Sequence, residues 1–246
     1  LGLNVLTYDY RGYGQSSGAP GEAGLYLDGE AALDWLRREA NIAPKELMVF
    51  GRSMGGTVAA YLATEHSVAG LVLESSFTSV PDMAQDLYWW LPARWLARIR
   101  LDTQAFLAQS RQPTLVIHSE DDEIIPFSHG QKLFAVAPQP RKFLTIRGSH
   151  NTGFMDSREV YIAGLDVFIA DMLSRREYVI DVFAAGPDLY HFQAGRSLAY
   201  LDNILDVLAC IEPCHRSPFE TIGPALTESA RQISTAVVIM LNWDNE

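Results

Sequence analysis

The sequence has 246 residues, which is enough for one large globular domain or two small ones. Hydrophobic residues make up 48% of the chain and charged residues 20%, a composition that excludes a mainly disordered protein. The 19 lysines and arginines stand against 30 acidic residues, and the formal net charge of −11 would repel a phosphate backbone. We therefore expect no nucleic-acid partner.

The two cysteines, Cys210 and Cys214, are too few for a disulfide framework and are typical of a reducing compartment. No apolar run approaches the ~20 residues that cross a bilayer, and no basic region followed by an apolar core opens the chain. These features predict a soluble, cytoplasmic chain, with membrane association left open for a longer native protein. Because residues 3–9 already have the pattern of a buried strand, we expect the chain to begin inside a fold.

Short apolar runs alternate with segments of helical periodicity, which predicts an α/β fold with a mainly parallel sheet covered on both faces. We expect strands at residues 3–9, 47–50, 70–74, 114–118 and 142–147. Three amphipathic helices are expected to turn inward the residues Leu25, Ala32, Trp35 and Leu36; Val58, Ala59, Leu62 and Ala63; and Tyr161, Leu165, Phe168, Ile169 and Met172.

Two regions depart from this alternation. Residues 77–113 are too long for a simple connection and are rich in aromatic residues, which predicts an inserted lid. The helix that contains Met172 is expected to close a first domain, residues 1–173. The remaining segment, residues 174–246, is predicted to be a short α/β tail with strands at 178–183 and 236–241 and a helix around 198–208.

A G-x-S-x-G motif, residues 51–55, stands where a predicted strand meets a predicted helix. A sharp strand-to-helix turn lifts the serine oxygen clear of the backbone, glycine tolerates the crowding on either side, and the helix N-terminus favours negative charge. We therefore predict that Ser53 is a nucleophile and that the backbone N–H of Met54 is an oxyanion donor. The alternative is a tight turn that only packs a helix on the sheet. Ser16 and Ser197 lie in similar strings without the strand–turn–helix context.

A nucleophilic serine needs a base and a carboxylate that orients it. Of the six histidines, His150 alone follows a predicted strand immediately, at the sheet edge where ligands bind in such folds. Four consecutive acids, residues 120–123, follow the strand at 114–118. Asp122 has room to curl back over the sheet and is the preferred acid, with Asp121 as the alternative.

The order Ser53, Asp122, His150 resembles that of α/β-hydrolases, specifically the serine esterases of the alpha/beta-hydrolase-domain type related to monoacylglycerol lipases and depalmitoylases. The resemblance covers about residues 1–173 and rests on five blocks, residues 8–16, 51–56, 73–79, 118–126 and 148–151. It implies an α/β-hydrolase fold and an acyl-serine hydrolase with no metal or organic cofactor. It also selects Asp122, which stands four residues after the strand-end His118.

The resemblance carries one departure. Relatives have earlier strands, one of which lies between the strands at 3–9 and 47–50 and supplies the second oxyanion donor; nothing in this sequence matches it. We therefore expect an N-terminally truncated hydrolase with a gap beside the Ser53 turn. The tail faintly resembles part of a von Willebrand A-like domain but lacks its metal-binding signature. Cys210, Cys214 and His215 are expected to be buried helix residues rather than half of a zinc site.

These features together predict acyl transfer from an ester or thioester to Ser53, followed by hydrolysis. Trp89, Trp90 and Trp95 of the lid, bordered by arginines, are predicted to bind an acyl chain or contact a membrane surface; the alternative is that they seal the lid onto the domain. The expected partner is a small acyl ester, including a lipid. A serine peptidase or an acyltransferase would use the same three residues. A non-catalytic fragment that acts as an interaction module is a further alternative.

Overall fold

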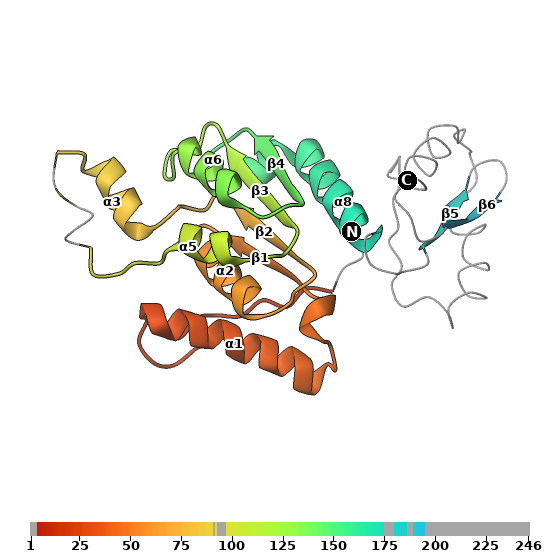
Figure 1. Ribbon diagram of the computed structural model, residues 1–246, viewed down its shortest axis with the longest axis horizontal. Helices are drawn as coiled ribbons and strands as arrows, with labels where there is room; N and C mark the ends of the chain where they lie inside the picture. The colour runs from red at the N-terminus through yellow and green to blue at the C-terminus, as the bar shows by residue number, and fades with distance from the viewer. Residues whose placement is uncertain (1–3, 91, 93–96, 175–179, 186–188, 195–246) are drawn as a thin grey trace. The chain divides into compact units, whose positions relative to one another are not determined.

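The computed structural model describes residues 4–90, 92, 97–174, 180–185 and 189–194 (Figure 1). The chain divides into two compact units, Thr7–Phe168 on the one hand and Leu1–Leu6 together with Ile169–Glu246 on the other. The main sheet lies in the first unit and an antiparallel strand pair in the second. The border that the sequence places after residue 173 stays a prediction.

Four parallel strands form the sheet of the first unit. They are β1 (Met48–Arg52), β2 (Gly70–Glu74), β3 (Thr114–Ser119) and β4 (Arg141–Ile146), and they are paired in that order. Every residue of β2 and β3 is buried, whereas β1 and β4 are largely half-buried. Because all four strands run the same way, their carboxyl ends meet at one edge of the sheet, where the loops that follow them converge.

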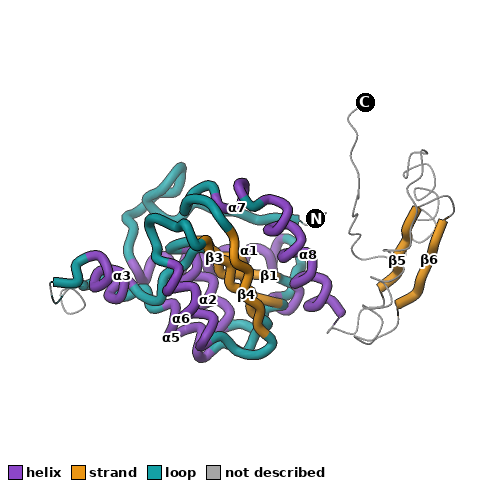
Figure 2. Tube along the Cα trace, turned by 90° about the horizontal axis from the view of Figure 1, so that it is seen from above, coloured by secondary structure: helices purple, strands orange, loops and turns teal. Residues whose placement is uncertain are grey.

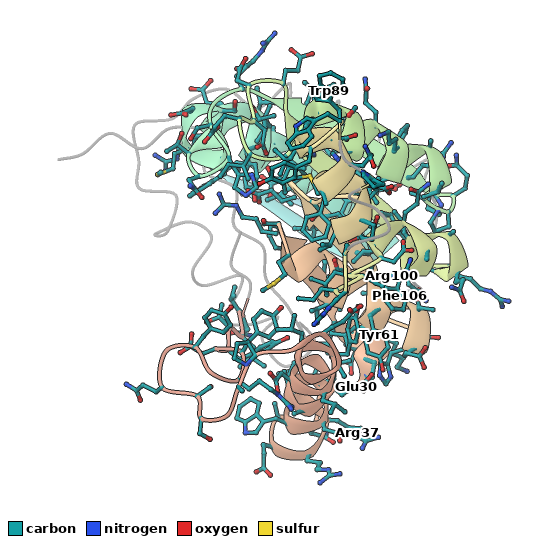
Figure 3. All side chains as sticks on the ribbon, turned by 90° about the vertical axis from the view of Figure 1, so that its left-hand side faces the viewer. Glu30, Arg37, Tyr61, Trp89, Arg100 and Phe106 are labelled. Atoms are coloured by element: carbon teal, nitrogen blue, oxygen red, sulfur yellow. The ribbon has the colours of Figure 1, made fainter. Side chains whose placement is uncertain are left out.

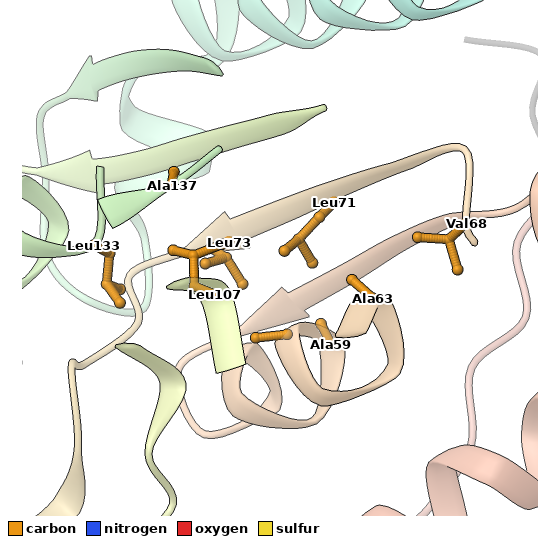
Figure 4. Packing of buried hydrophobic residues seen from close by; sticks show 9 residues of the cluster. Ala59, Ala63, Val68, Leu71, Leu73, Leu107, Leu133 and Ala137 are labelled. Atoms are coloured by element: carbon orange, nitrogen blue, oxygen red, sulfur yellow. The ribbon is translucent and has the colours of Figure 1, made fainter. Parts of the chain in front are cut away.

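Helices cover both faces of this sheet (Figure 2). On one face α2 (Gly55–Glu65), α5 (Thr103–Gln109) and α6 (Phe127–Val136) enclose a core in which Leu71 and Leu73 of β2 contact small residues of α2 (Figure 4). On the other face Val72 of β2 lies in a cluster with Phe168 of α8 (Arg158–Ser174). The alternation along β2 thus divides the apolar residues between two cores.

The helix α1 (Glu22–Glu39) packs on α2 rather than on the sheet. Of the four residues predicted to face inward, Leu25 is buried, Ala32 and Leu36 are half-buried, and Trp35 is 52% exposed; the buried face consists of Gly24, Leu25, Gly29 and Leu33. The prediction is wrong for Trp35 because a glycine sets the contact: a Cβ on Gly29 would lie 2.9 Å from Cγ1 of Val58. Close approach of two helices, and not side-chain size, decides which face of α1 is covered.

The remaining helices and turns join these layers. A short 3-10 helix, η1 (Pro44–Glu46), precedes β1, and α7 (Gly153–Asp156) precedes α8. Tyr61 of α2 and Phe106 of α5 lie edge to face, with ring centroids 5.4 Å apart (Figure 3). The predicted inner residues of α2 are all buried, and so are four of the five predicted for α8, namely Leu165, Phe168, Ile169 and Met172.

Four of the five predicted strands are confirmed within two residues, but residues 4–9 form no strand. Val5 is 80% exposed, and within the described part of the chain no strand pairs with this segment or with the outer edge of β1. A strand without a hydrogen-bonding neighbour has nothing to stabilise it, so an apolar pattern alone does not form one.

The predicted lid region begins with α3 (Val80–Leu87), which extends away from the helices that cover the sheet (Figure 1). Ser79 caps this helix, since its Oγ accepts a hydrogen bond of 3.1 Å from the backbone N–H of Asp82. Residues 91 and 93–96 lie outside the described residues.

In the tail, β5 (Ile180–Ala185) and β6 (Leu189–Ala194) form an antiparallel pair, and β5 overlaps the strand predicted at 178–183. The predicted helix around 198–208, the predicted strand at 236–241, both cysteines and His215 lie outside the described residues. Among the helices that the structure describes, none is both long enough and apolar enough to cross a bilayer.

Candidate active site

The turn after β1 holds Ser53 in a constrained backbone conformation. Its φ is 53°, in the left-handed region that non-glycine residues rarely occupy, and its N–H donates a hydrogen bond of 2.9 Å to the carbonyl of Glu74. A Cβ on Gly51 would lie 2.3 Å from the carbonyl oxygen of Gly55, so the turn has no room for one. The turn therefore lifts Ser53 out of the strand at the start of α2.

Crowding is not equal at the glycines of the motif. The second glycine of the motif was predicted to be crowded, and this is wrong for Gly55. A Cβ at Gly55 would lie 3.6 Å from the Tyr10 hydroxyl, which is an ordinary van der Waals contact. Gly56 is the crowded position, because its Cβ would lie 2.0 Å from Oγ of Ser76. The tight approach thus occurs one residue further along, where α2 packs against Ser76, two residues after the carboxyl end of β2.

Asp122 and His150 meet above the carboxyl ends of β3 and β4. Nδ1 of His150 lies 2.8 Å from Oδ2 of Asp122, and both side chains are buried. The other carboxylate oxygen, Oδ1, accepts hydrogen bonds from the N–H groups of Ile124 and Ile125 at 3.0 and 2.8 Å. The carboxylate is fixed by the loop on one oxygen and holds the imidazole with the other.

The histidine at the end of β3 supports this loop from below. His118 is fully buried, and its Nε2 lies 2.9 Å from the carbonyl of Ile125 and 3.6 Å from Oδ2 of Asp122. Burial lowers the pKa of His118 below its usual value, which keeps the imidazole neutral. A neutral ring with its proton on Nε2 donates to the Ile125 carbonyl.

The three acids beside Asp122 have other contacts. Asp121 is 51% exposed and accepts from Arg147 Nη1 at 3.2 Å and from the Gly148 N–H at 3.3 Å. Glu120 pairs with the same arginine, and Glu123 accepts from the His150 N–H at 2.9 Å. The alternative acid, Asp121, thus binds the backbone of the histidine loop rather than the imidazole.

The structure brings two of the three predicted residues into direct contact. Ser53 lies at the same sheet edge, but among the described residues no hydrogen bond joins its Oγ to His150. Trp89 and Trp90 are 79% and 65% exposed, and no ring contact joins either to another described aromatic residue. Trp95 lies outside the described residues.

Sequence reasoning missed the residue next to the predicted nucleophile. Arg52 donates from Nη2 to the His150 carbonyl, and its Nε lies 3.3 Å from Oε1 of Glu74. The other oxygen of Glu74 accepts from the Tyr161 hydroxyl at 2.6 Å. A signal was present in the sequence, since Glu74 is the single charged residue of an otherwise apolar strand.

A hollow of about 390 Å³ lies at the base of the predicted lid. Ser79 and Asp82 line it from the start of α3, and Arg100 and Asp102 from the segment before α5. Ser53, Asp122 and His150 do not line it, so it is separate from the candidate site. Within the part of the chain that the structure describes, no group of three or more His, Cys, Asp or Glu side chains is placed to hold a metal ion.

Comparison with solved structures defines the class of fold. An esterase from Pyrococcus furiosus covers 67% of this chain and 68% of its own at a TM-score of 0.55 and 17% identity. An α/β-hydrolase from Vibrio vulnificus covers 66% of this chain and 61% of its own at a TM-score of 0.54 and 22% identity. The four-stranded parallel sheet with helices on both faces has the α/β-hydrolase fold.

Sequence comparisons agree with the fold. Residues 1–105 match the family model described as serine aminopeptidase S33. An uncharacterized Mycobacterium tuberculosis protein is 39% identical over 61% of this chain, and alpha/beta hydrolase domain-containing protein 17B of Xenopus laevis is 32% identical over 70%. The chain spans 54% and 58% of their lengths. The chain thus has the alpha/beta-hydrolase fold, and its sequence is similar to proteins described as alpha/beta hydrolases.

Proposed function

We propose that this chain is a serine hydrolase that cleaves carboxylic esters or thioesters, with Ser53 as nucleophile, His150 as base and Asp122 as the orienting acid. The buried contact of 2.8 Å between Nδ1 of His150 and Oδ2 of Asp122 carries the proposal. The alpha/beta-hydrolase fold, the match of residues 1–105 to a hydrolase family model and the strained turn at Ser53 support it. The proposed chemistry needs no cofactor.

The geometry of the pair determines the role of each nitrogen of His150. Since Asp122 accepts the proton on Nδ1, the lone pair of the imidazole is on Nε2, which is the base. Nε2 takes the Ser53 proton as Oγ attacks the carbonyl carbon, and it gives that proton to the leaving alcohol or thiol. Water repeats the cycle on the acyl-enzyme and releases the acid. In serine hydrolases the hydrogen bond between nucleophile and base is often long or absent before substrate binds, so the lack of one between Ser53 and His150 among the described residues does not contradict the proposal.

The start of α2 supports stabilisation of the oxyanion. Met54 is the N-cap of this helix, and within the described residues its N–H donates no backbone hydrogen bond. An N–H at a helix N-terminus favours negative charge, so the Met54 N–H is the proposed oxyanion donor.

An apolar acyl group is the proposed substrate class, and contact with a lipid surface is proposed for the lid. Leu87, Tyr88, Trp89, Trp90 and Ile99 are each at least half exposed at the end of α3 and in the segment that follows. Aromatic residues of this kind favour a lipid–water interface.

Active-site labelling with a fluorophosphonate tests the nucleophile. The wild type should be labelled at Ser53 and should hydrolyse p-nitrophenyl esters, whereas Ser53→Ala should lose labelling and at least about 1000-fold in ester hydrolysis. Ser16→Ala, in the similar string of the N-terminal loop, is the matched control and should behave as the wild type. Equal labelling of wild type and Ser53→Ala would overturn the proposal.

A serine aminopeptidase is the second candidate, supported by the description of the family model that matches residues 1–105. The same three residues would then attack an amide. Aminoacyl p-nitroanilides distinguish the two, because the esterase hydrolyses them at least about tenfold less efficiently than p-nitrophenyl esters of similar size. The reverse preference would assign the peptidase.

A further inference from the structure

To act on Ser53, His150 must lie far from β4, the strand that precedes it. Ser53 follows β1 and His150 follows β4, with β2 and β3 between them, so the two strands are separated by three spacings of about 4.8 Å. The histidine loop must therefore cross over two strands to reach Ser53. Asp122 orients the imidazole, but it comes from β3 and does not itself connect the loop to the turn that holds Ser53.

The side chain of Arg52 makes that connection. It comes from the last residue of β1, next to Ser53, and its Nη2 donates to the backbone carbonyl of His150. The N–H on the other side of His150 donates to Oε2 of Glu123 at 2.9 Å. The backbone of His150 is thus held at both its carbonyl and its N–H, independently of the ring.

Arg52 itself contacts two other elements, and a third holds its partner Glu74. Its Nε lies 3.3 Å from Oε1 of Glu74 at the end of β2, and its guanidinium carbon lies 5.5 Å from the centre of the Phe154 ring in α7. Glu74 in turn accepts 2.6 Å from the hydroxyl of Tyr161 in α8. The Glu74 carboxyl is buried, and burial raises its pKa, while the Tyr161 hydroxyl and the Arg52 charge act in the opposite direction.

We propose that Arg52, held by Glu74 and Tyr161, is a positioning residue that fixes the backbone of His150 relative to Ser53. This inference rests on the proposed serine hydrolase function and adds to it a group that acts through His150 without touching the substrate. A guanidinium suits the role because Nη2 donates to the His150 carbonyl while the charge, with Nε 3.3 Å from Oε1, forms an ion pair with Glu74; a lysine ammonium does this with less directional control.

Arg52→Met in the full chain tests the role. A displacement of the base by about 1 Å costs on the order of 100-fold, so we expect kcat for a p-nitrophenyl ester to fall about 30- to 100-fold while KM changes less than about 3-fold. Because His150 serves both steps, acylation and deacylation should slow by similar factors. Arg52→Lys should recover part of the loss. Arg37→Met removes an exposed arginine of α1 that pairs with Asp34 and should match the wild type.

Tyr161→Phe provides a milder test, which also applies if Arg52→Met does not fold. It deletes one hydroxyl that orients Glu74, and we expect kcat to fall about 3- to 10-fold with KM unchanged. The double variant Arg52→Met/Tyr161→Phe should be no slower than Arg52→Met, because Tyr161 acts through the arginine. Losses that multiply would contradict a common pathway.

A spectroscopic measurement separates this inference from the proposed function. The low-field proton resonance of the His150 Nδ1–H, bonded to Asp122, should be sharp in the wild type and in Arg37→Met and broadened or lost in Arg52→Met. If the wild type is not labelled at Ser53, the proposed function fails whatever the resonance shows. If it is labelled, and Arg52→Met keeps both the resonance and the wild-type labelling rate, the positioning role alone is overturned.

Discussion

The corner formed by Asp122 and His150 and the exposed end of α3 differ in how their side chains are held. At the corner both oxygens of Asp122 accept hydrogen bonds, and His150 is bound through its ring, its N–H and its carbonyl. At the end of α3, the Trp89 side chain is 79% exposed. The hydrogen bond described for this residue involves its backbone carbonyl, which accepts from Nε2 of Gln85. The proposed reacting groups are therefore ordered before substrate arrives, whereas the proposed recognition surface is open to solvent.

The largest expected effect falls on the ordered corner. Asp122→Asn should lower kcat by about 10³- to 10⁴-fold, because an amide in place of the carboxylate favours the wrong tautomer of His150. Asp121→Asn, next to it, should cost less than about 3-fold, since Asp121 is half exposed and contacts Arg147 and Gly148. Steady-state hydrolysis of a short p-nitrophenyl ester measures both. Equal losses in the two variants would break the distinction between the neighbouring acids.

The next effect concerns the turn that supports the corner. Gly51→Ala should lower the free energy of unfolding by about 2–3 kcal/mol, because its Cβ would lie 2.3 Å from a backbone oxygen that cannot move away easily. Gly55→Ala should leave stability within about 1 kcal/mol of the wild type, because the position is open and helical. Urea denaturation followed by circular dichroism measures the difference. Similar losses at both glycines would contradict the uneven crowding.

A third test concerns the buried histidine that joins α6 to the predicted lid. His129 accepts at Nδ1 from the Thr78 N–H at 3.1 Å, and its Nε2 lies 3.0 Å from Asp86 of α3. Burial lowers its pKa below 6.5 despite the attraction of Asp86 and Asp82, with Lys132 acting in the same direction as burial. Below pH 6.5, therefore, the imidazole of His129 binds a proton more readily in the unfolded chain than in the folded chain.

The free energy of unfolding should consequently fall as pH drops below 6.5, by at most about 1.4 kcal/mol per pH unit from this group. His118, whose pKa is also lowered by burial, acts in the same direction. His129→Gln should reduce the slope between pH 6.5 and 5.5. Urea midpoints at several pH values measure this, and an unchanged slope in His129→Gln would contradict it.

The smallest effect is expected at the open surface. Trp89→Ala should lower kcat/KM about 3- to 10-fold for long-chain p-nitrophenyl esters and leave acetate and butyrate esters unchanged, because the proposed role of the lid is to bind the distal part of a long acyl chain. Trp35→Ala removes another exposed tryptophan, from α1, and should have no effect on either. The same loss for short and long esters would remove the proposed role of the lid in acyl binding.

The carboxyl edge of the sheet could be predicted because its pattern is local. Each of β1 to β4 contains a short apolar run, and Asp122 and His150 stand on the loops that directly follow β3 and β4. The parallel direction of the strands then brings loops that are distant in the sequence to one edge. The adjacency of Asp122 and His150 required no knowledge of side-chain geometry.

The features that the sequence predicted wrongly, or did not predict, depend on contacts between distant segments. Residues 4–9 have the composition of a strand but no strand to pair with among the described residues, and the buried face of α1 is set by Gly29 against α2. The link from Arg52 through Glu74 to Tyr161 joins β1, β2 and α8, and no spacing rule connects positions 22 and 87 residues apart. Such contacts follow from the packing of elements rather than from any single element.

The left-handed backbone at Ser53 carries an evolutionary consequence. With φ at 53°, this position favours glycine, which has no Cβ to strain, yet the proposed chemistry needs a hydroxyl there. Ser53→Gly should therefore make the fold more resistant to heat while abolishing turnover. Selection for a more robust protein and selection for a faster enzyme would rank the residues at this position in opposite orders, so a serine retained here is a mark of function rather than of folding.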